Sequence, residues 1–313
     1  MSVGSAYFDY PWRRKGLDHD LFSMRYLVDS KPVNWPGGKP VALWVSVDID
    51  WFPLDMGSKP FVPPGGMVKA YPDVWNYTAR DYGNRIGIYR LLDVMTAAGA
   101  TATAFINGEV ARRYPLLLDA VGEAGWEIAA HGLDMGHLHH SGLDRETERK
   151  LVVETPAMLT RGKNRPVGWH SPAYGESFAT PELVAEAGFS YIADWVNDEM
   201  PYRIDTKAGP LVSMPIAYEL SDKRILFEQN QRLDEFTSQI RAALTTLKAE
   251  STPEDGRILA ISLSPWVTGQ PYRIAAWREL MTELMADEAV WCATGCELAA
   301  HWRKLAEAGA ATP

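Results

Sequence analysis

The chain has 313 residues, of which 46% are hydrophobic and 23% charged, and its formal net charge is −9 at neutral pH. This length and balance suit one globular α/β barrel and exclude a low-complexity or disordered chain. Because negative charge repels phosphate backbones and anionic lipid surfaces, we expect no nucleic-acid partner and no membrane partner.

The first part of the chain, residues 1–40, is predicted to be an N-terminal extension that packs on the main domain. Prolines and glycines interrupt it, and no helical period survives: Pro11, Pro32, Pro36, Gly37, Gly38 and Pro40. Residues 1–14 lack the pattern of a signal peptide, and no apolar run approaches the ~20 residues of a membrane span. We therefore expect a cytoplasmic protein, and the extension favours a homo-oligomer.

The rest of the chain, residues 41–313, is predicted to be a single barrel domain. Short apolar runs predict strands over residues 41–47, 101–106, 126–130, 166–170, 191–195, 211–216, 258–264 and 290–293. Amphipathic patterns predict helices over residues 84–98, 107–124 with a break near Pro115, 144–161, 180–187, 233–250 and 274–286. Residues 51–82 are read as a long loop that forms a lid or wall of a site. Repeated alternation of strand and helix predicts a parallel sheet that is closed or nearly closed into a barrel.

Polar residues end many of the predicted strands, and in an α/β barrel these ends converge on the active site. The set is Asp48, Asp50, Asn107, Glu109, His131, His170, Asp194 and Ser264. Asp48 and Asp50 are two residues apart, which puts both carboxylates on one face of a strand. One is expected to act as a general acid or base, and the other as an orienting partner or metal ligand. The alternative is that a carboxylate only caps a loop.

Histidines cluster in the middle of the chain. Five of the seven fall between residues 131 and 170: His131, His137, His139, His140 and His170. Imidazoles titrate near neutral pH, so the cluster favours a catalytic site. Residues 137–140 are also compatible with a solvated loop. The two cysteines, Cys292 and Cys296, match no zinc or redox motif and are expected to be idle thiols.

Several short segments together resemble the polysaccharide deacetylase superfamily, and especially its allantoinase-like and cyclic-imide-hydrolase-like branch. They are residues 46–50 (SVDID), 80–87 (RDYGNRIG), 107–109 (NGE), 130–132 (AHG), 165–172 (RPVGWHSP), 193–198 (ADWVND), 264–274 (SPWVTGQPYRI) and 293–295 (ATG). The resemblance implies a distorted (β/α)7 barrel of the polysaccharide deacetylase type. In metal-dependent members it also implies that Asp48 is the base and that Asp50 and His131 are ligands of a zinc-like ion.

The sequence departs from that family pattern at three positions. Met135 stands where the second ligand histidine is expected, His170 where an arginine orients the base, and Ser264 where a late histidine acts as acid. A thioether is a poor substitute for imidazole in an oxygen-rich zinc site. We therefore predict no metal; if zinc or another divalent ion is bound, the ligands would be Asp50, His131 and His137.

Without a metal, the four residues Asp48, Asp50, His131 and His170 form a workable acid–base set. The predicted substrate-binding residues are Trp51, Arg85, Asn107, Glu109, Trp169, Trp195, Ser264, Trp266, Gln270 and Arg273. In this reading Asn107 and Ser264 donate to an oxyanion, and Arg85, Gln270 and Arg273 anchor a carbonyl or carboxylate. The tryptophans are equally compatible with core positions, and Glu109 with a helix-dipole role.

The first functional hypothesis is a hydrolase that cleaves a C–N bond of a small cyclic amide or imide by carboxylate and histidine catalysis without a metal. One alternative is a metal-free lyase or isomerase that acts on an aromatic or carbonyl small molecule. A second is a metal-dependent sugar N-deacetylase, and a third is a protein that binds a ligand without chemistry.

Overall fold

Strand β1 (Val41–Ile49) shows how the sequence builds the two sides of the sheet. Its odd-numbered residues pack outward against the helices, while Ala42 and Trp44 join a separate inner cluster. Asp48 follows on this inner face because side chains alternate along a strand. The computed structural model describes residues 19–22, 26–27, 30–55, 72–162 and 164–309.

The sheet contains eight further strands in the described residues. They are β2 (Thr103–Ile106), β3 (Glu127–Ala130), β4 (Gly168–Trp169), β5 (Tyr191–Ile192), β6 (Tyr202–Thr206), β7 (Gly209–Ser213), β8 (Arg257–Leu263) and β9 (Val290–Cys292). The order is β6-β7-β5-β4-β3-β2-β1-β8, and β9 also pairs with β1. All described pairings are parallel except that of β6 with β7.

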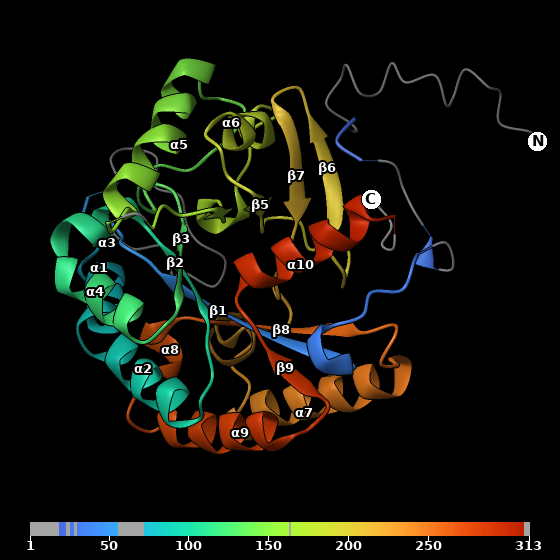
Figure 1. Cartoon of the computed structure of the whole chain (residues 1–313). Helices are drawn as coiled ribbons and strands as arrows, with labels where there is room; N and C mark the ends of the chain where they lie inside the picture. The colour runs from blue at the N-terminus through green and yellow to red at the C-terminus, as the bar shows by residue number, and fades with distance from the viewer. Residues whose placement is uncertain (1–18, 23–25, 28–29, 56–71, 163, 310–313) are drawn as a thin grey trace, which may run out of the picture.

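Helices surround this curved sheet (Figure 1). They are α1 (Val74–Tyr82), α2 (Ile88–Ala97), α3 (Gly108–Arg113), α4 (Pro115–Glu123), α5 (Arg145–Leu159), α6 (Thr180–Glu186), α7 (Leu233–Glu250), α8 (Pro265–Thr268), α9 (Ile274–Ala286) and α10 (Gly295–Glu307). Two π-helices are also present, Gly83–Gly87 (η5) and Lys223–Glu228 (η7). No helix in the described ranges has the length and apolar character needed to cross a bilayer.

The expected α/β barrel of the polysaccharide deacetylase type is confirmed, but as an incomplete barrel. Among the described residues no strand pairing joins β7 or β6 to β8. Instead, a single parallel bridge between Ser221 and Ser262 attaches the segment after β7 to β8. The sheet is therefore an open arc, and an irregular segment passes along β8 where a closed barrel would place a strand.

Aromatic side chains fill the inner side of the arc below the strand ends. Trp44, Phe105 and Tyr191 are each 0–1% exposed and belong to one inner cluster. Leu298 and Trp302 of α10 pack on the same cluster, so α10 covers the inner side of the sheet. Polar side chains within this filling pair with one another, as Ser46 does with Ser262 and Tyr191 with Glu127, and the candidate site lies at the carboxyl ends of the strands, as in other α/β barrels.

All eight predicted strands are present, and the structure adds elements that the sequence reading missed. Strand β6 runs antiparallel to β7, and α10 follows β9 directly. The predicted loop over residues 51–82 contains helix α1, which begins with Asp73 accepting a hydrogen bond from the Asn76 backbone N–H at 2.9 Å. Residues 56–71 of that predicted loop lie outside the described residues.

The N-terminal segment contacts the sheet at several of its described residues. The backbone N–H of Asp205 in β6 donates to the carbonyl of Leu21 at 2.7 Å, and the rings of Phe22 and Tyr202 lie 4.8 Å apart. Trp35 is 1% exposed and donates to the Arg257 carbonyl at 3.1 Å. The domain limits 1–40 and 41–313 stay a prediction.

Helix α8 and the π-helix η5 approach so closely that only glycine fits between them. A Cβ added at Gly87 would lie 2.1 Å from the carbonyl oxygen of Pro265, and one added at Gly269 would lie 2.4 Å from the Cα of Gly87. This contact fixes the position of α8 against η5. It thereby also fixes Ser264, the residue that directly precedes α8.

We expect Gly87→Ala to lower the free energy of unfolding by about 2 kcal/mol or more, because the clash is with backbone and cannot be relieved by a side-chain rotation. Gly122→Ala in α4 is the matched control, since an added Cβ there meets nothing within 4 Å. The control should be neutral or stabilising by up to about 1 kcal/mol. Urea unfolding of both variants measures the difference, and equal stabilities would contradict the packing argument.

Candidate active site

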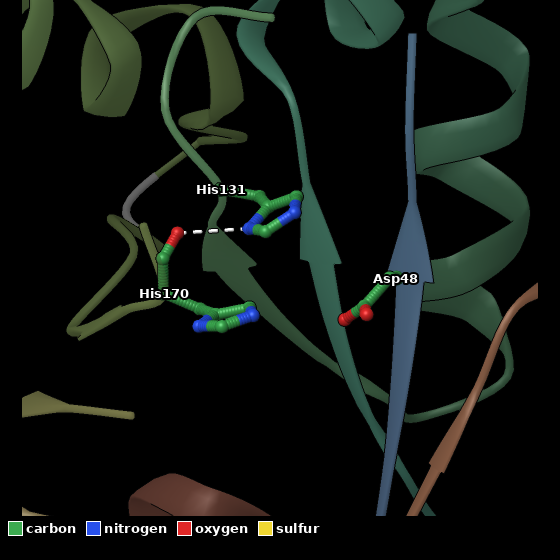
Figure 2. A group of neighbouring side chains, drawn as sticks. All are labelled: Asp48, His131 and His170. Atoms are coloured by element: carbon green, nitrogen blue, oxygen red, sulfur yellow. Dashed lines mark hydrogen bonds between the residues drawn. The ribbon is translucent and has the colours of Figure 1, made fainter. Parts of the chain in front are cut away.

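Carboxyl ends of neighbouring strands bring an aspartate and two histidines together (Figure 2). Asp48 lies near the end of β1, His131 follows β3, and His170 follows β4. One ligand-type atom of each residue lies within 4.8 Å of those of the other two. The two imidazole rings stack with centroids 4.6 Å apart and planes inclined by 19°, and Asp48 faces them from β1.

Both ring nitrogens of His131 face acceptors. Nδ1 lies 2.8 Å from the carbonyl oxygen of His170, and Nε2 lies 3.3 Å from Oδ1 of Asp50. A nitrogen that faces a carbonyl or carboxylate oxygen must carry a hydrogen to bond with it. The arrangement therefore favours the doubly protonated, positively charged ring.

The pKa values of the pair agree with this assignment. Burial acts against the charge on His131, but the hydrogen bond to Asp50 and the charges of Asp48 and Asp50 outweigh it and raise the pKa of His131 above its ordinary 6.5. Burial also acts against the charge on Asp50, but the hydrogen bond and charge of His131 lower the pKa of Asp50. The two groups form a buried ion pair near neutral pH.

Asp48 differs from Asp50 in making no ion-pair contact with a histidine among the described residues. Oδ1 of both aspartates is buried and outside hydrogen-bond geometry there, but that of Asp50 lies 3.3 Å from Nε2 of His131. Burial raises the pKa of Asp48 above 3.8, against the charges of His170 and His131, which lower it. Two carboxylates two residues apart thus have opposite pKa shifts, which is the pattern expected of a base and its orienting neighbour.

His170 is oriented by a second aspartate. Its Nδ1 lies 2.7 Å from Oδ1 of Asp194, which also accepts the backbone N–H of Ser171 at 2.6 Å. Burial opposes the charge on Asp194, but these two bonds and the charge of His170 lower the pKa of Asp194. Since Nδ1 is held as a donor, His170 keeps Nε2 free on the side of Asp48.

Glu176 adds a neutral carboxyl group behind this pair. Its Oε1 accepts a hydrogen bond from the indole N–H of Trp195 at 3.2 Å. Burial, together with the charge of Asp194, raises the pKa of Glu176 well above its ordinary value. Asp194 is therefore the ionised member of the Asp194–Glu176 pair at neutral pH.

Asn107 has a structural role in place of the predicted donation to an oxyanion. Its Oδ1 accepts the backbone N–H of Trp51 at 2.8 Å, and its Nδ2 donates to the carbonyl of His131. Both ends of the amide are thus used to fasten β1, β2 and β3 at the level of the site. Ser264 is buried and its backbone N–H binds Asp222, so the predicted donation to an oxyanion is not supported for this backbone group.

Several predicted substrate-binding residues point away from the cluster. Arg85 is 67% exposed and pairs with Asp81 at 3.3 Å, because it lies on the outer side of η5. Glu109 pairs with Arg112 and Arg113 in the first turn of α3. Arg85 and Glu109 are thus held in ion pairs, and Glu109 lies in the first turn of α3, where the helix-dipole alternative expects it; their predicted roles in substrate binding stay predictions.

The predicted tryptophan wall is mostly core. Trp169 is completely buried in the outer core and donates to Ser171 Oγ at 2.8 Å. Trp266 is 7% exposed beneath the Arg80 guanidinium, and Trp51 lies beneath that of Arg113.

Gln270 and Arg273 make hydrogen bonds within their own part of the chain. Gln270 donates to the Trp266 carbonyl at 3.0 Å, and Arg273 donates to the Val267 carbonyl at 3.1 Å. Both side chains therefore stabilise the end of α8, and neither is held in a position that anchors substrate.

The predicted alternative metal ligand His137 also lies elsewhere. Its Nδ1 is 2.8 Å from Oδ1 of Asp134, and its side chain is 54% exposed. The residue at the family's second histidine position, Met135, is 3% exposed. The metal set Asp50, His131 and His137 is not brought together; Asp48, His131 and His170 are.

Sequence reasoning missed three buried or partly buried groups near the cluster. Arg80 is 3% exposed between the rings of Phe52 and Trp266, and its charge lowers the pKa of Asp50. Asp222 is completely buried, and Lys223 follows it. Arg80 lies in the same sequence segment as Arg85, residues 80–87. The aromatic residues Phe52 and Trp266 were the sequence signal for a buried cation there.

A cavity of about 870 Å³ lies at the other end of the strands and is separate from the cluster. Its lining includes Cys292, Cys296 and Trp126 but no member of the aspartate–histidine cluster. Burial raises the pKa of each cysteine to about 11, so both thiols are protonated at neutral pH. The cysteines are therefore poor nucleophiles.

The fold and the position of the cluster define an α/β-barrel protein with an acid–base site at the carboxyl ends of its strands. Residues 76–192 match the family described as polysaccharide deacetylase. This match, which spans less than half of the chain, confirms the resemblance to the polysaccharide deacetylase superfamily.

Known relatives span most of the chain. A Schizosaccharomyces pombe protein, named as a candidate polysaccharide deacetylase, is 26% identical over 71% of this chain and 74% of its own length. A solved candidate polysaccharide deacetylase from Pseudomonas aeruginosa PAO1 is 25% identical, with a TM-score of 0.79 over 90% of this chain and 98% of that one. The solved PuuE allantoinase is 26% identical, also with a TM-score of 0.79, over 91% and 98%.

We expect Asp194→Asn to lower the turnover of whatever substrate the site accepts by roughly 10²–10⁴-fold, because His170 loses the charged acceptor that holds Nδ1 as a donor. Nitrogen NMR of the His170 ring should report a changed tautomer. Asp134→Asn is the matched control, since it removes the same kind of contact from the half-exposed His137. An unchanged His170 spectrum in Asp194→Asn would contradict the orienting role.

Proposed function

We propose that this protein is a hydrolase that cleaves the C–N bond of a small, cyclic amide or imide by acid–base catalysis. The observation that carries the proposal is the opposite state of the two aspartates: Asp50 is in ion-pair contact with His131 and its pKa is lowered, while Asp48 makes no such contact among the described residues and its pKa is raised. The match to the polysaccharide deacetylase family and the similarity to an allantoinase support C–N bond hydrolysis in general.

In the proposed reaction, Asp48 takes a proton from a water molecule whose oxygen adds to the carbonyl carbon. His170, which must carry hydrogens on both ring nitrogens at this step, then gives the Nε2 proton to the ring nitrogen as the C–N bond breaks, which leaves one open-chain product with a carboxylic acid and an amide or amine. The proton on Asp48 passes back to His170, and the site is restored. The His131–Asp50 ion pair balances the negative charge that builds up between Asp48 and the substrate.

The family also contains metal-dependent members, so the donor set matters. The usual ligand position at residue 135 is a buried methionine, which does not fit a zinc-like ion. Asp48, His131 and His170 do supply one carboxylate and two imidazoles, a set that zinc accepts. An ion held by these three would act as a Lewis acid on the carbonyl, but His131 would have to leave Asp50 to bind it. We therefore favour the metal-independent reaction.

The first test is a substrate screen with chelator-treated protein. We expect ring opening of cyclic imides, hydantoins or allantoin, and expect Asp48→Asn to lower kcat by at least about 10²-fold because the general base is lost. Asp93→Asn, on an exposed face of α2, should leave kcat unchanged. Activity that depends on added zinc would favour the sugar deacetylase, and turnover only of aromatic substrates without water addition would favour the lyase.

The second test is the pH dependence of kcat/KM. Asp48 must be ionised and its pKa is raised, so activity should fall as the pH drops through a value above 3.8. His131 must be protonated and its pKa is also raised, so activity should fall again as the pH rises through a value above 6.5. In Asp50→Asn the alkaline limb should move to lower pH, because the negative charge of Asp50, which helps to raise the pKa of His131, is gone. If the alkaline limb stays at the same pH in Asp50→Asn, a group other than His131 sets that limb.

A further inference from the structure

Residue Lys223 opens the π-helix η7, and the residue before it fixes its position. The Asp222 carboxylate accepts the backbone N–H of Ser264 at 2.9 and 3.0 Å, that of Thr268 at 3.2 Å and the Thr268 hydroxyl at 2.6 Å. Leu263 at the end of β8 pairs with Val47 of β1. Ser264 and Asp48 therefore leave their strands at the same level, and Asp222 fastens the start of η7 there.

A chain of aromatic contacts links the same helix to His170. The His170 and Tyr174 rings lie 4.6 Å apart, and those of Tyr174 and Tyr218 lie 5.6 Å apart. The guanidinium of Arg224 lies 5.3 Å from the Tyr218 ring centre. The first residues of η7 thus lie on the rim of the aspartate–histidine cluster.

Lys223 differs from Arg224 in having no charged partner. Arg224 pairs with Glu228 at 3.4 Å and with Glu219 at 3.8 Å. The ammonium group of Lys223 makes no hydrogen bond or ion pair within the described ranges, although the residue is half-buried. Its charge acts to lower the pKa of both Asp48 and Asp50, in keeping with the position that Asp222 gives it beside the end of β8.

The backbone donors that commonly hold an oxyanion are already occupied at three strand ends. The Ser264 N–H binds Asp222, the Ser171 N–H binds Asp194, and the Trp51 N–H binds Asn107. Arg80 is enclosed between two rings. Lys223 is therefore the cation beside the cluster that has its donors free.

We propose that the ammonium group of Lys223 binds the carbonyl oxygen of the scissile C–N group and stabilises the negative charge that this oxygen gains as water adds. The assignment rests on the proposed hydrolase function. The carbonyl carbon would then lie between Asp48, which activates the water, and the ammonium group of Lys223. A preorganised cation at this position stabilises the transition state more than the bound substrate.

The test compares Lys223→Met and Lys223→Gln with Arg224→Gln, which removes the neighbouring, already paired cation. For a substrate found in the screen, each Lys223 variant should lower kcat by roughly 10²–10³-fold with KM changed only a few-fold. Lys223→Arg should recover part of kcat, and Arg224→Gln should keep wild-type kcat. Circular dichroism checks that each variant is folded.

A second readout needs no substrate. Acetate, whose carboxylate resembles the oxyanion, is titrated into the protein while the ring protons of His131 and His170 are followed by NMR. We expect saturable shifts in the wild type and in Arg224→Gln, and none in Lys223→Met or Lys223→Gln. Unchanged acetate shifts in both Lys223 variants, or equal loss in Arg224→Gln, would overturn the assignment. If no amide or imide is hydrolysed but the acetate shifts depend on Lys223, the hydrolase function fails while the anion site stands.

Discussion

The contact between His131 and its two acceptors is the constraint around which the site is organised. A carboxylate and an imidazole are buried together at the end of the sheet, which is costly unless each is paired. Asp50 supplies the charge, and the His170 carbonyl fixes the ring. Because that carbonyl belongs to the residue whose own ring stacks on His131, one backbone position at the end of β4 orients both histidines.

The cost of burying unpaired polar groups also explains why the site has so many supporting residues. Asn107, Asp194 and Asp222 each bind backbone groups at a strand end. They satisfy donors and acceptors that the irregular backbone would otherwise leave unpaired. Asp48, Nε2 of His170 and the ammonium group of Lys223 are not used in these contacts, which leaves them available for a substrate.

Much of the fold and the centre of the site were predictable from the sequence, and the reasons are physical. Apolar runs that end in Asp48, His131 and His170 predicted both the strands and their convergence. The pattern could not show that Arg80 is buried and Arg85 exposed, because that depends on how the π-helix η5 turns. Nor could it indicate Lys223, which reaches the site only because Asp222 fastens η7 to the end of β8.

The incomplete closure of the sheet between β7 and β8 affects how the substrate selectivity of such a protein can be altered. Between β7 and β8 the bridge Ser221–Ser262 and the contacts of Asp222 join the chain to the end of β8, and the irregular stretch before them leads into η7. Insertions before Ser221 would leave every described strand ladder intact. We therefore expect that selectivity can be altered by grafting a new stretch before Ser221, while Asp222, Lys223 and the acid–base groups keep their positions.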